Sequence, residues 1–381
     1  MFANLLRDLD QCRQELLQCC PADEEYRTQY HPDLSPAGWH VGHCIFTENY
    51  WIREILLGRS CDNEDEKSLY IPEYSTKPKR GASLPEHAVM IDWAGKSFSE
   101  NNELLRQYCD DGHELLRDNF LLHFLVQHYS QHLETLAMSR CQAGLKKTNG
   151  GSVNDTLVSR ALKREALSLP AGYYPVGRKE QHRPYDNESP AHAVEIDPAL
   201  IAKCPVTNAE YLRFIERGGY DTKCYWSDAG WQWLQNNQVS CPEYWHQSPT
   251  GGWCLVGTNG LQSLLPENPV YGINHHEATA FANWANARLP HEHEWEAAFN
   301  LGLLQHTGRV WEWCRNTFYP YDGFRAWPYE GYSVPYFDNA HYTLKGGSTL
   351  TRRVIKRPSF RNYYEADKRF IFAGIRLVFN K

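Results

Sequence analysis

The sequence has no long apolar run. No stretch approaches the roughly 18 to 20 consecutive apolar residues that a membrane-spanning helix requires, and the mean hydropathy is −0.62. The opening MFANLLRDLDQC carries acidic residues early and lacks the basic start, apolar middle and small-residue cleavage site of a signal peptide. We therefore expect a cytoplasmic protein with no membrane partner.

An excess of basic residues is also missing. The 39 Lys and Arg residues face 46 Asp and Glu residues, and the formal net charge is −7. No basic stripe is present that would neutralise the phosphates of a nucleic acid. The 12 cysteines include no C-x-x-C pair and no disulfide-framework spacing. We therefore expect reduced thiols, no structural zinc and no nucleic-acid partner.

Aromatic and histidine side chains are abundant, with 13 Trp, 23 Tyr and 17 His. Histidine is the commonest metal ligand in proteins, so a metal site is worth seeking. The 381 residues exceed what one core organises, and at about 150 residues per domain the length predicts two domains.

The first part of the chain, residues 1–141, has the pattern of helices. Apolar residues such as Leu5, Leu9 and Leu16 recur at the i, i+3, i+4 and i+7 spacing of one helix face. Connected by short and medium loops, such helices are typical of a four-helix bundle. Four helices are predicted, near the N-terminus and over 40–57, 97–116 and 119–138.

The composition and the hydropathy pattern change after residue 146. The polar, glycine-bearing stretch 147–152 predicts a linker, with the boundary between about 142 and 165. Beyond it come short alternating runs, many Gly and Pro residues and only two clear helices, over 208–216 and 276–287. The predicted fold class is α+β in two domains, a helical bundle over 1–150 and an irregular α/β domain over 160–381.

The fourth predicted helix carries a candidate metal site. His128 and His132 are separated by one helical turn, the spacing that presents two imidazoles to one ion. At about 100° per residue, Glu134 is rotated well away from that face, and His123 lies on the side of Glu134. We therefore expect neither of these two to be a ligand. The alternative is that His128 and His132 are ordinary surface histidines.

A third ligand has to come from another helix. The segment GWHVGHC offers His40 and His43, three residues apart, and spacing alone leaves both open, with His43 preferred. Three neutral imidazoles without a carboxylate suit Zn, Fe, Cu or Ni and leave positions open for other ligands. The spacing does not name the metal.

These residues carry a family resemblance. GWHVGH together with HYSQHLE resembles the iron-binding DinB-like bundle. The second half resembles formylglycine-generating enzymes (sulfatase-modifying factors), which have an irregular α/β, C-type-lectin-like fold. Fused, the two halves resemble the ergothioneine-type sulfoxide synthases, including selenoneine synthase and ovothiol-type relatives. The motifs of the second half are LPAG, ESPAH, PVTNAEY, PVYGINHHEATAFANWANARLPHEHEWEAA, GRVWEW, LKGGS, RPSFRN and FAGIRL.

The sequence also departs from the formylglycine-generating pattern. Those enzymes have a cysteine pair near the end of the domain, whereas residues 348–377 contain no cysteine. This argues against a formylglycine-type enzyme that oxidises protein cysteines. Arg309 replaces the asparagine of GNVWEW, and His291 and His293 interrupt the usual RLPTEAEWE.

The resemblance implies an oxidoreductase. His43, His128 and His132 would hold Fe(II), with positions left for O2, a thiolate or selenolate, and the imidazole of hercynine or histidine. The implied reaction is O2-dependent formation of a C–S bond, giving a sulfoxide, or of a C–Se bond on the imidazole ring. The implied partners are therefore small molecules.

The resemblance also implies residues that contact the substrates. Gln131, Asn362 and Tyr363 would hold the histidine derivative, and Tyr363 would face a trimethylammonium group by cation–π attraction. Relatives of the mycobacterial type have Trp-Asp where this chain has Tyr363 and Tyr364. Loss of that aspartate indicates a sulfur or selenium donor other than the same peptide thiol.

Two further pairs of residues are candidates. Tyr329 or Tyr332 would be the tyrosine that donates a proton during the reaction. Arg357 and Arg361 would clamp a carboxylate with paired hydrogen bonds, or would form structural ion pairs of the domain.

Two alternatives to the leading function remain. Within the class, the chain would be a selenoneine synthase that uses a selenosugar donor. From another class, it would be a non-catalytic, metal-binding DinB-like or lectin-like module. Intact histidines at the three metal positions favour the enzyme.

Overall fold

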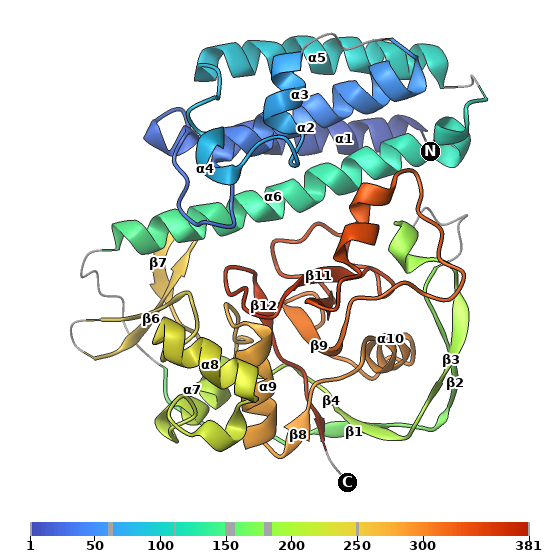
Figure 1. The fold of residues 1–381 in the computed structure, drawn as a ribbon. Coiled ribbons are helices and arrows are strands. Elements are labelled where there is room, and N and C mark those ends of the chain that lie inside the picture. Colours follow the sequence, from blue (N-terminus) through green and yellow to red (C-terminus); the bar gives the residue numbers. More distant parts are fainter. Residues whose placement is uncertain are drawn as a thin grey trace. The chain divides into compact units, whose positions relative to one another are not determined.

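The computed structural model describes residues 2–59, 64–109, 112–148, 157–178, 185–248 and 251–379. The chain divides into two compact units, Met1–Lys147 and Thr148–Lys381 (Figure 1). One unit is helical and the other contains sheets, which confirms the predicted α+β fold class with two domains. Of the predicted linker, residues 149–152 lie outside the described residues.

The first unit is built on four long helices that run alongside one another (Figure 1). Contacts between helices join α1 to α6, and α2 to both α5 and α6. In the described part of the chain, no helix is both long and apolar enough to cross a bilayer. The long helices are α1 (Phe2–Gln18), α2 (Ala37–Asn49), α5 (His87–Tyr108) and α6 (Phe120–Lys147). The shorter segments are η1 (Glu24–Tyr26), the π-helical η2 (Tyr50–Leu56), α3 (Glu64–Tyr70), α4 (Lys77–Arg80) and η3 (Glu114–Asn119).

The bounds of the helices differ from those predicted, most clearly for the third. The pattern placed it over 97–116, but α5 begins ten residues earlier, at His87 directly after the Pro85-Glu86 pair. Its first turns, HAVMIDWAGK, bury Met90 and Ala94 but expose the apolar Val89, so apolar residues are not confined to one face and the pattern is obscured. Proline just before a helix is a start signal, and here it was a better guide than periodicity.

A buried carboxylate ties the four long helices together. Glu48 of α2 is fully buried. It accepts hydrogen bonds from Arg13 Nε of α1 at 3.0 Å, Asn101 Nδ2 of α5 at 2.7 Å and the Tyr129 hydroxyl of α6 at 2.8 Å. A buried charge is tolerated only when it is paired and fully hydrogen-bonded. These four residues, which we call the Glu48 hub, therefore specify how the helices align.

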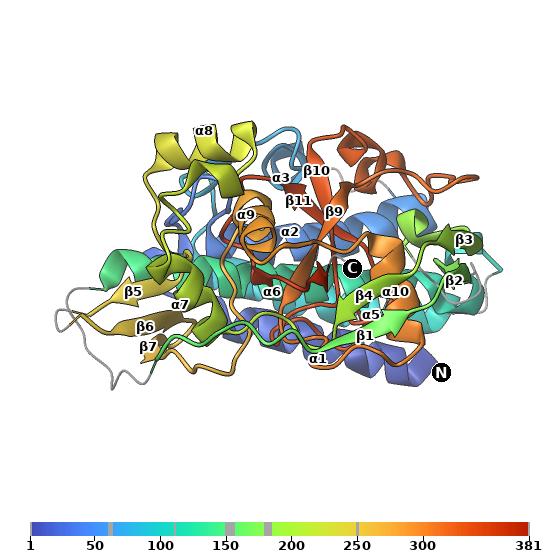
Figure 2. The ribbon, with the colours of Figure 1, turned by 90° about the horizontal axis from the view of Figure 1, so that it is seen from below.

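The second unit contains two four-stranded sheets, a hairpin and a three-stranded sheet among its described residues (Figure 2). The first sheet has the order β1 (Ala166–Leu169), β4 (Ala199–Ala202), β13 (Val378–Phe379) and β8 (Ala287–Arg288). The second has the order β11 (Asn362–Glu365), β10 (His341–Lys345), β9 (Trp311–Thr317) and β12 (Ala373–Gly374). The hairpin pairs β2 (Gly172–Val176) with β3 (His192–Ile196), and the small sheet contains β5 (Trp245–Gln247), β6 (Trp253–Gly257) and β7 (Gly260–Ser263).

All described pairings in these sheets are antiparallel except that of β12 with β9. The helices of the unit are α7 (Asn208–Glu216), α8 (Asp228–Asn237), α9 (His275–Trp284) and α10 (Glu292–Asn300). Its single-turn segments are η5 (Asp186–Glu188), η6 (Lys223–Tyr225), η7 (Glu330–Tyr332) and η8 (Val334–Tyr336).

The core of the second unit lies where α10 packs on the first sheet. Leu169, Ile201 and Val378 of that sheet pack with Ala297 and Ala298 of the helix, and all five are buried. The small alanine side chains let the helix approach the sheet closely. This packing fixes α10, whose first turn carries several of the residues considered below.

The Glu48 hub generates a stability prediction. Glu48→Ala should destabilise the helical unit, because it removes the buried carboxylate that pairs with Arg13 and leaves only the partly exposed Asp10 as an acidic partner. Breaking a buried pair typically costs about 3 to 5 kcal/mol. Urea unfolding measures the loss, and hydrogen exchange should localise it to α1, α2, α5 and α6. The matched control is Lys96→Ala, which removes the exposed Lys96–Asp92 pair of α5. Equal unfolding midpoints for the two variants would contradict the prediction.

Candidate metal centre

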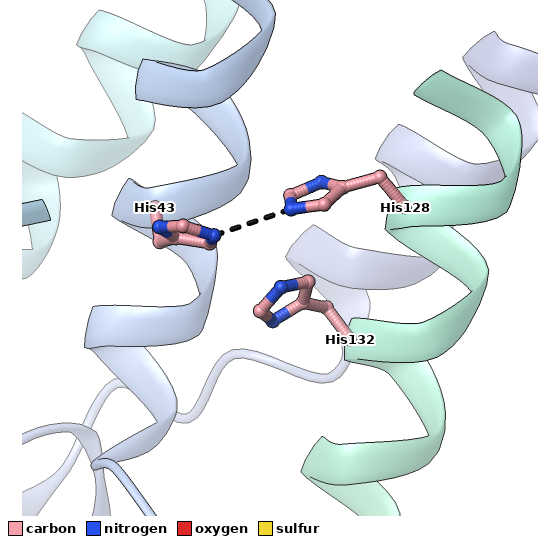
Figure 3. Close-up of side chains that lie close together, drawn as sticks. All are labelled: His43, His128 and His132. Atoms are coloured by element: carbon pink, nitrogen blue, oxygen red, sulfur yellow. Dashed lines mark hydrogen bonds between the residues drawn. The ribbon is translucent and has the colours of Figure 1, made fainter. Parts of the chain in front are cut away.

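Three histidines from two helices meet inside the first unit. His43 lies on α2, and His128 and His132 lie one turn apart on α6 (Figure 3). One ligand atom from each of the three lies within 4.8 Å of the others. The Nε2 atoms of His43 and His128 face each other at 3.2 Å. The structure thus brings together the three residues that the sequence singled out.

The glycines of the GWHVGH segment explain how α2 reaches this position. A Cβ atom on Gly42 would lie 2.3 Å from the Tyr70 ring, and one on Gly38 would lie 2.3 Å from the Tyr26 ring. Any larger residue would therefore push one of these tyrosines off the helix. The two rings pack directly against α2 on the turns that carry His43.

The orientation of His43 is set by its surroundings. Its Nδ1–H donates to the Tyr70 carbonyl at 2.7 Å. Its ring stacks on Trp39, with centroids 4.7 Å apart and planes 12° from parallel. A hydrogen bond from Nδ1 fixes the tautomer whose Nε2 lone pair is available for a metal.

Burial keeps the cluster neutral. It lowers the pKa of His43 to about 4. Burial, followed by the neighbouring histidines, holds the pKa of His128 and of His132 well below the usual value. The Nδ1 atom of His128 is buried without a hydrogen-bond partner in the described structure. Because metal ligands must be deprotonated, three neutral imidazoles at one point fit a bound divalent ion.

The other histidine of the motif, His40, lies beside the cluster rather than in it. Its Nδ1 is 2.9 Å from Nδ1 of His132. Burial, and then the neighbouring His43, lower the pKa of His40 to about 3. Glu134 and His123 also stay outside: within the described residues, the histidine, cysteine and acidic side chains that gather closely enough to hold an ion are His43, His128 and His132 alone.

The same unit contains a cavity of about 800 Å³, whose described lining includes Tyr70 but none of the three histidines. Tyr70 contacts both the histidine cluster and the cavity, because its carbonyl accepts the His43 Nδ1–H and its side chain lines the cavity. The Arg80 guanidinium lies 3.8 Å above the Trp39 ring, the ring on which His43 stacks. The lining combines aromatic, cationic and acidic side chains, among them Tyr70, Trp93, Lys79, Arg80, Asp65 and Glu66.

The two candidate proton donors lie on a loop of the second unit. Tyr329 precedes η7 and is 41% exposed, whereas Tyr332 is half-buried and stacks on Tyr185 with centroids 4.1 Å apart. The Ser333 hydroxyl donates to the Asp186 carboxylate, and burial raises the pKa of Asp186 to about 6. This bond anchors the loop one residue beyond Tyr332. The catalytic role of either tyrosine stays a prediction.

The residues expected to hold the histidine derivative are found on different elements. Gln131 is half-buried on α6, between His128 and His132. Asn362 opens β11, and its Oδ1 accepts the backbone N–H of Tyr363 at 3.0 Å. The Tyr363 ring stacks on Phe318, with centroids 4.2 Å apart, and its hydroxyl donates to the backbone carbonyl of Tyr332. Tyr363 therefore braces that loop, and its contact with a trimethylammonium stays a prediction.

The two arginines are engaged inside their own unit. Arg361 is fully buried, and its Nε and Nη2 donate to Glu292 at 2.6 and 2.8 Å. Although burial acts in the opposite direction, this guanidinium lowers the pKa of Glu292 to about 2. Arg357 pairs in the same two-pronged way with the buried Glu188. Because the donors that would clamp a carboxylate substrate are already bonded, the structure favours the alternative of structural ion pairs.

The unusual His291 and His293 have a local explanation. Nδ1 of His291 accepts the backbone N–H of His293 at 3.2 Å, and the backbone N–H of His291 donates to the Glu294 carboxylate at 2.7 Å. This is a capping box at the start of α10. The His293 Nε2 lies 3.2 Å from the Tyr319 hydroxyl. These substitutions serve the helix start and the packing around it.

Sequence reasoning missed some residues that shape the site. The Tyr70 carbonyl is one, because a backbone acceptor leaves no mark on residue type. Glu48 is another: an isolated acidic residue within an apolar helix signals a buried charge that needs a partner, and that signal was available in the sequence.

Comparisons with known proteins agree with this architecture. Residues 8–136 match the DinB superfamily, and residues 155–300 and 300–381 match the family of the sulfatase-modifying factor enzyme 1-like domain. The hercynine oxygenase of Mycolicibacterium thermoresistibile is 28% identical over 444 residues, which cover 99% of this chain and 95% of that protein. That of Mycolicibacterium smegmatis is 29% identical over 420 residues, 94% of each chain. The formylglycine-generating enzyme of Thermomonospora curvata is 30% identical over 152 residues, 36% of this chain and 50% of that protein.

The geometry predicts opposite outcomes for two neighbours on α6. His128→Ala should bind less than one equivalent of metal, because only two imidazoles of the cluster remain. Glu134→Gln should bind as the unaltered chain does, because its carboxylate lies outside the cluster. Elemental analysis after anaerobic loading with Fe(II) and desalting measures both. Full iron in His128→Ala, or none in Glu134→Gln, would refute the ligand assignment.

Proposed function

The chain belongs to the ergothioneine-type sulfoxide synthase family, and we propose that it is an Fe(II)- and O2-dependent oxidoreductase. It joins sulfur, as a sulfoxide, or selenium to the imidazole ring of hercynine or histidine. The observation that carries the proposal is the cluster of His43, His128 and His132, three neutral imidazoles gathered inside a helical bundle.

The donor set supports iron as the metal. Imidazole suits Fe, and three protein ligands leave positions open for further molecules. When bound, Fe(II) supplies the one-electron chemistry with O2 that a closed-shell protein side chain lacks. Since none of the three ligands is charged, the ion keeps its full charge and favours an anionic sulfur or selenium.

The protein residues supply binding and orientation. The Tyr70 carbonyl and the Trp39 ring hold His43, so its Nε2 keeps one direction. Holding the reactants in one geometry replaces improbable encounters in solution. The cavity next to Tyr70 suits a small zwitterion, since Lys79 can face a carboxylate while Asp65 and Glu66 can face an ammonium.

Residues of the second unit complete the proposal. Tyr329 or Tyr332 donates a proton during the reaction, and the bond between Ser333 and Asp186 holds the loop that carries both. Asn362 and Tyr363, together with Gln131 of α6 in the first unit, hold the histidine derivative. Arg357 and Arg361 take no part in substrate binding in this proposal, because Glu188 and Glu292 occupy them.

The proposal leaves two candidates for the sulfur or selenium donor. The resemblance implies Trp-Asp in the mycobacterial type at the positions of Tyr363 and Tyr364, and this difference favours a donor other than the same peptide thiol. A selenosugar, used by a selenoneine synthase, is the second candidate.

A competition assay tests the proposed reaction. The Fe(II)-loaded chain is offered hercynine and histidine in air, with cysteine, γ-glutamylcysteine and a selenosugar as donors, and products are read by mass spectrometry. We expect one sulfoxide or selenium adduct, which identifies the donor, and none with His128→Ala. No adduct, with O2 uptake unchanged by every substrate, would instead indicate a non-catalytic metal-binding module.

The tyrosine loop generates a separate prediction. Of Tyr329→Phe and Tyr332→Phe, one should change the ratio of coupled product to uncoupled oxidation while iron content stays at the level of the unaltered chain. The reason is that loss of one hydroxyl removes the proton but leaves the metal ligands in place. Tyr173→Phe, which changes an exposed tyrosine of β2, is the control. If both variants match that control, the proton-donor assignment fails.

A further inference from the structure

A fourth histidine contacts the cluster. His40 lies on α2 one turn before His43, is 4% exposed, and its Nδ1 lies 2.9 Å from Nδ1 of His132. Its Nε2 is buried without a hydrogen-bond partner in the described structure. The proposed function uses neither nitrogen.

The position of one proton follows from metal binding. In Figure 3, one ring nitrogen of His132 faces His43 and His128, and the other points away from them. The nitrogen near His40 is Nδ1, so Nε2 is the one that faces the cluster. A metal at Nε2 takes its lone pair, and the single proton of a neutral imidazole must then be on Nδ1. The contact between the two Nδ1 atoms is therefore a hydrogen bond that His132 donates.

The same logic fixes the proton of His40. Its Nδ1 accepts the bond, so that nitrogen carries a lone pair and the proton of the neutral ring is on Nε2. We propose that His40 is a positioning residue of the metal centre: its Nδ1 accepts the Nδ1–H of His132 and holds that ring with Nε2 directed at the metal. His40 itself is not a ligand.

His43 and His132 are held in matching ways by different groups. The Nδ1–H of His43 donates to a backbone carbonyl, that of Tyr70, and no substitution removes such an acceptor. The Nδ1–H of His132 donates to a side chain. The support of His132 can therefore be removed and restored by substitution, which makes it testable.

The inference rests on the proposed metal site and is tested by metal affinity, using Zn(II) alone as the probe and the full chain. His40→Ala removes the acceptor and should weaken Zn(II) binding by about 10- to 100-fold, the usual cost of losing such a partner. His40→Asn should restore most of the affinity, because its side-chain oxygen can occupy the place of Nδ1. His87→Ala is the control, since His87 begins α5 and packs edge-on against Tyr26, outside the cluster.

Nitrogen NMR gives a readout that a purely structural role would not move. In the Zn(II)-loaded chain labelled with ¹⁵N-histidine, His132 should be protonated at Nδ1 and His40 at Nε2. A metal-shifted His40 nitrogen would make His40 a ligand and overturn the proposal. If His40→Ala bound Zn(II) as tightly as the unaltered chain, the role of His40 would be wrong but the proposed metal site would stand. If the unaltered chain bound no Zn(II), the proposed metal site would be wrong as well.

Discussion

The metal centre depends on the buried carboxylate of Glu48. This one group accepts hydrogen bonds from α1, α5 and α6 while belonging to α2. Glu48 lies five residues after His43, and Tyr129, which bonds to it, is adjacent to His128. The contact that sets the distance between α2 and α6 is therefore made next to the ligands themselves. A polar network of this kind, with every member bonded, favours one helix alignment over others of similar apolar packing.

Within this helical bundle, the three imidazoles of the site stay neutral and keep a fixed orientation toward the metal position. Burial opposes their protonation, so the cluster is ready for a metal without first losing protons. Each supporting contact then limits rotation of a ring: the Tyr70 carbonyl and the Trp39 stack for His43, and His40 for His132. The result is a preorganised donor set, which is what separates a functional metal site from histidines that merely lie close together.

Part of this could be predicted from the sequence because helix geometry is regular. The i, i+4 spacing placed His128 and His132 on one face and turned Glu134 away from it, as the structure has it. Spacing did not separate His40 from His43, since the two lie about one turn apart on the same side of α2. That choice depends on how the helix is rotated against α6, which the Glu48 hub and the close contacts at Gly42 determine. Likewise, no local pattern shows that Arg361 is occupied by Glu292, because 69 residues separate them.

The central claim is that α2 and α6 hold one metal ion through three neutral imidazoles. Anomalous diffraction at the iron edge, from crystals loaded with Fe(II) without oxygen, tests it most directly. We predict one strong peak within bonding distance of Nε2 of His43, His128 and His132, with no carboxylate in contact. A peak bonded to Glu134 or another acidic residue, or a full-occupancy peak that contacts fewer than three of these imidazoles, would contradict it.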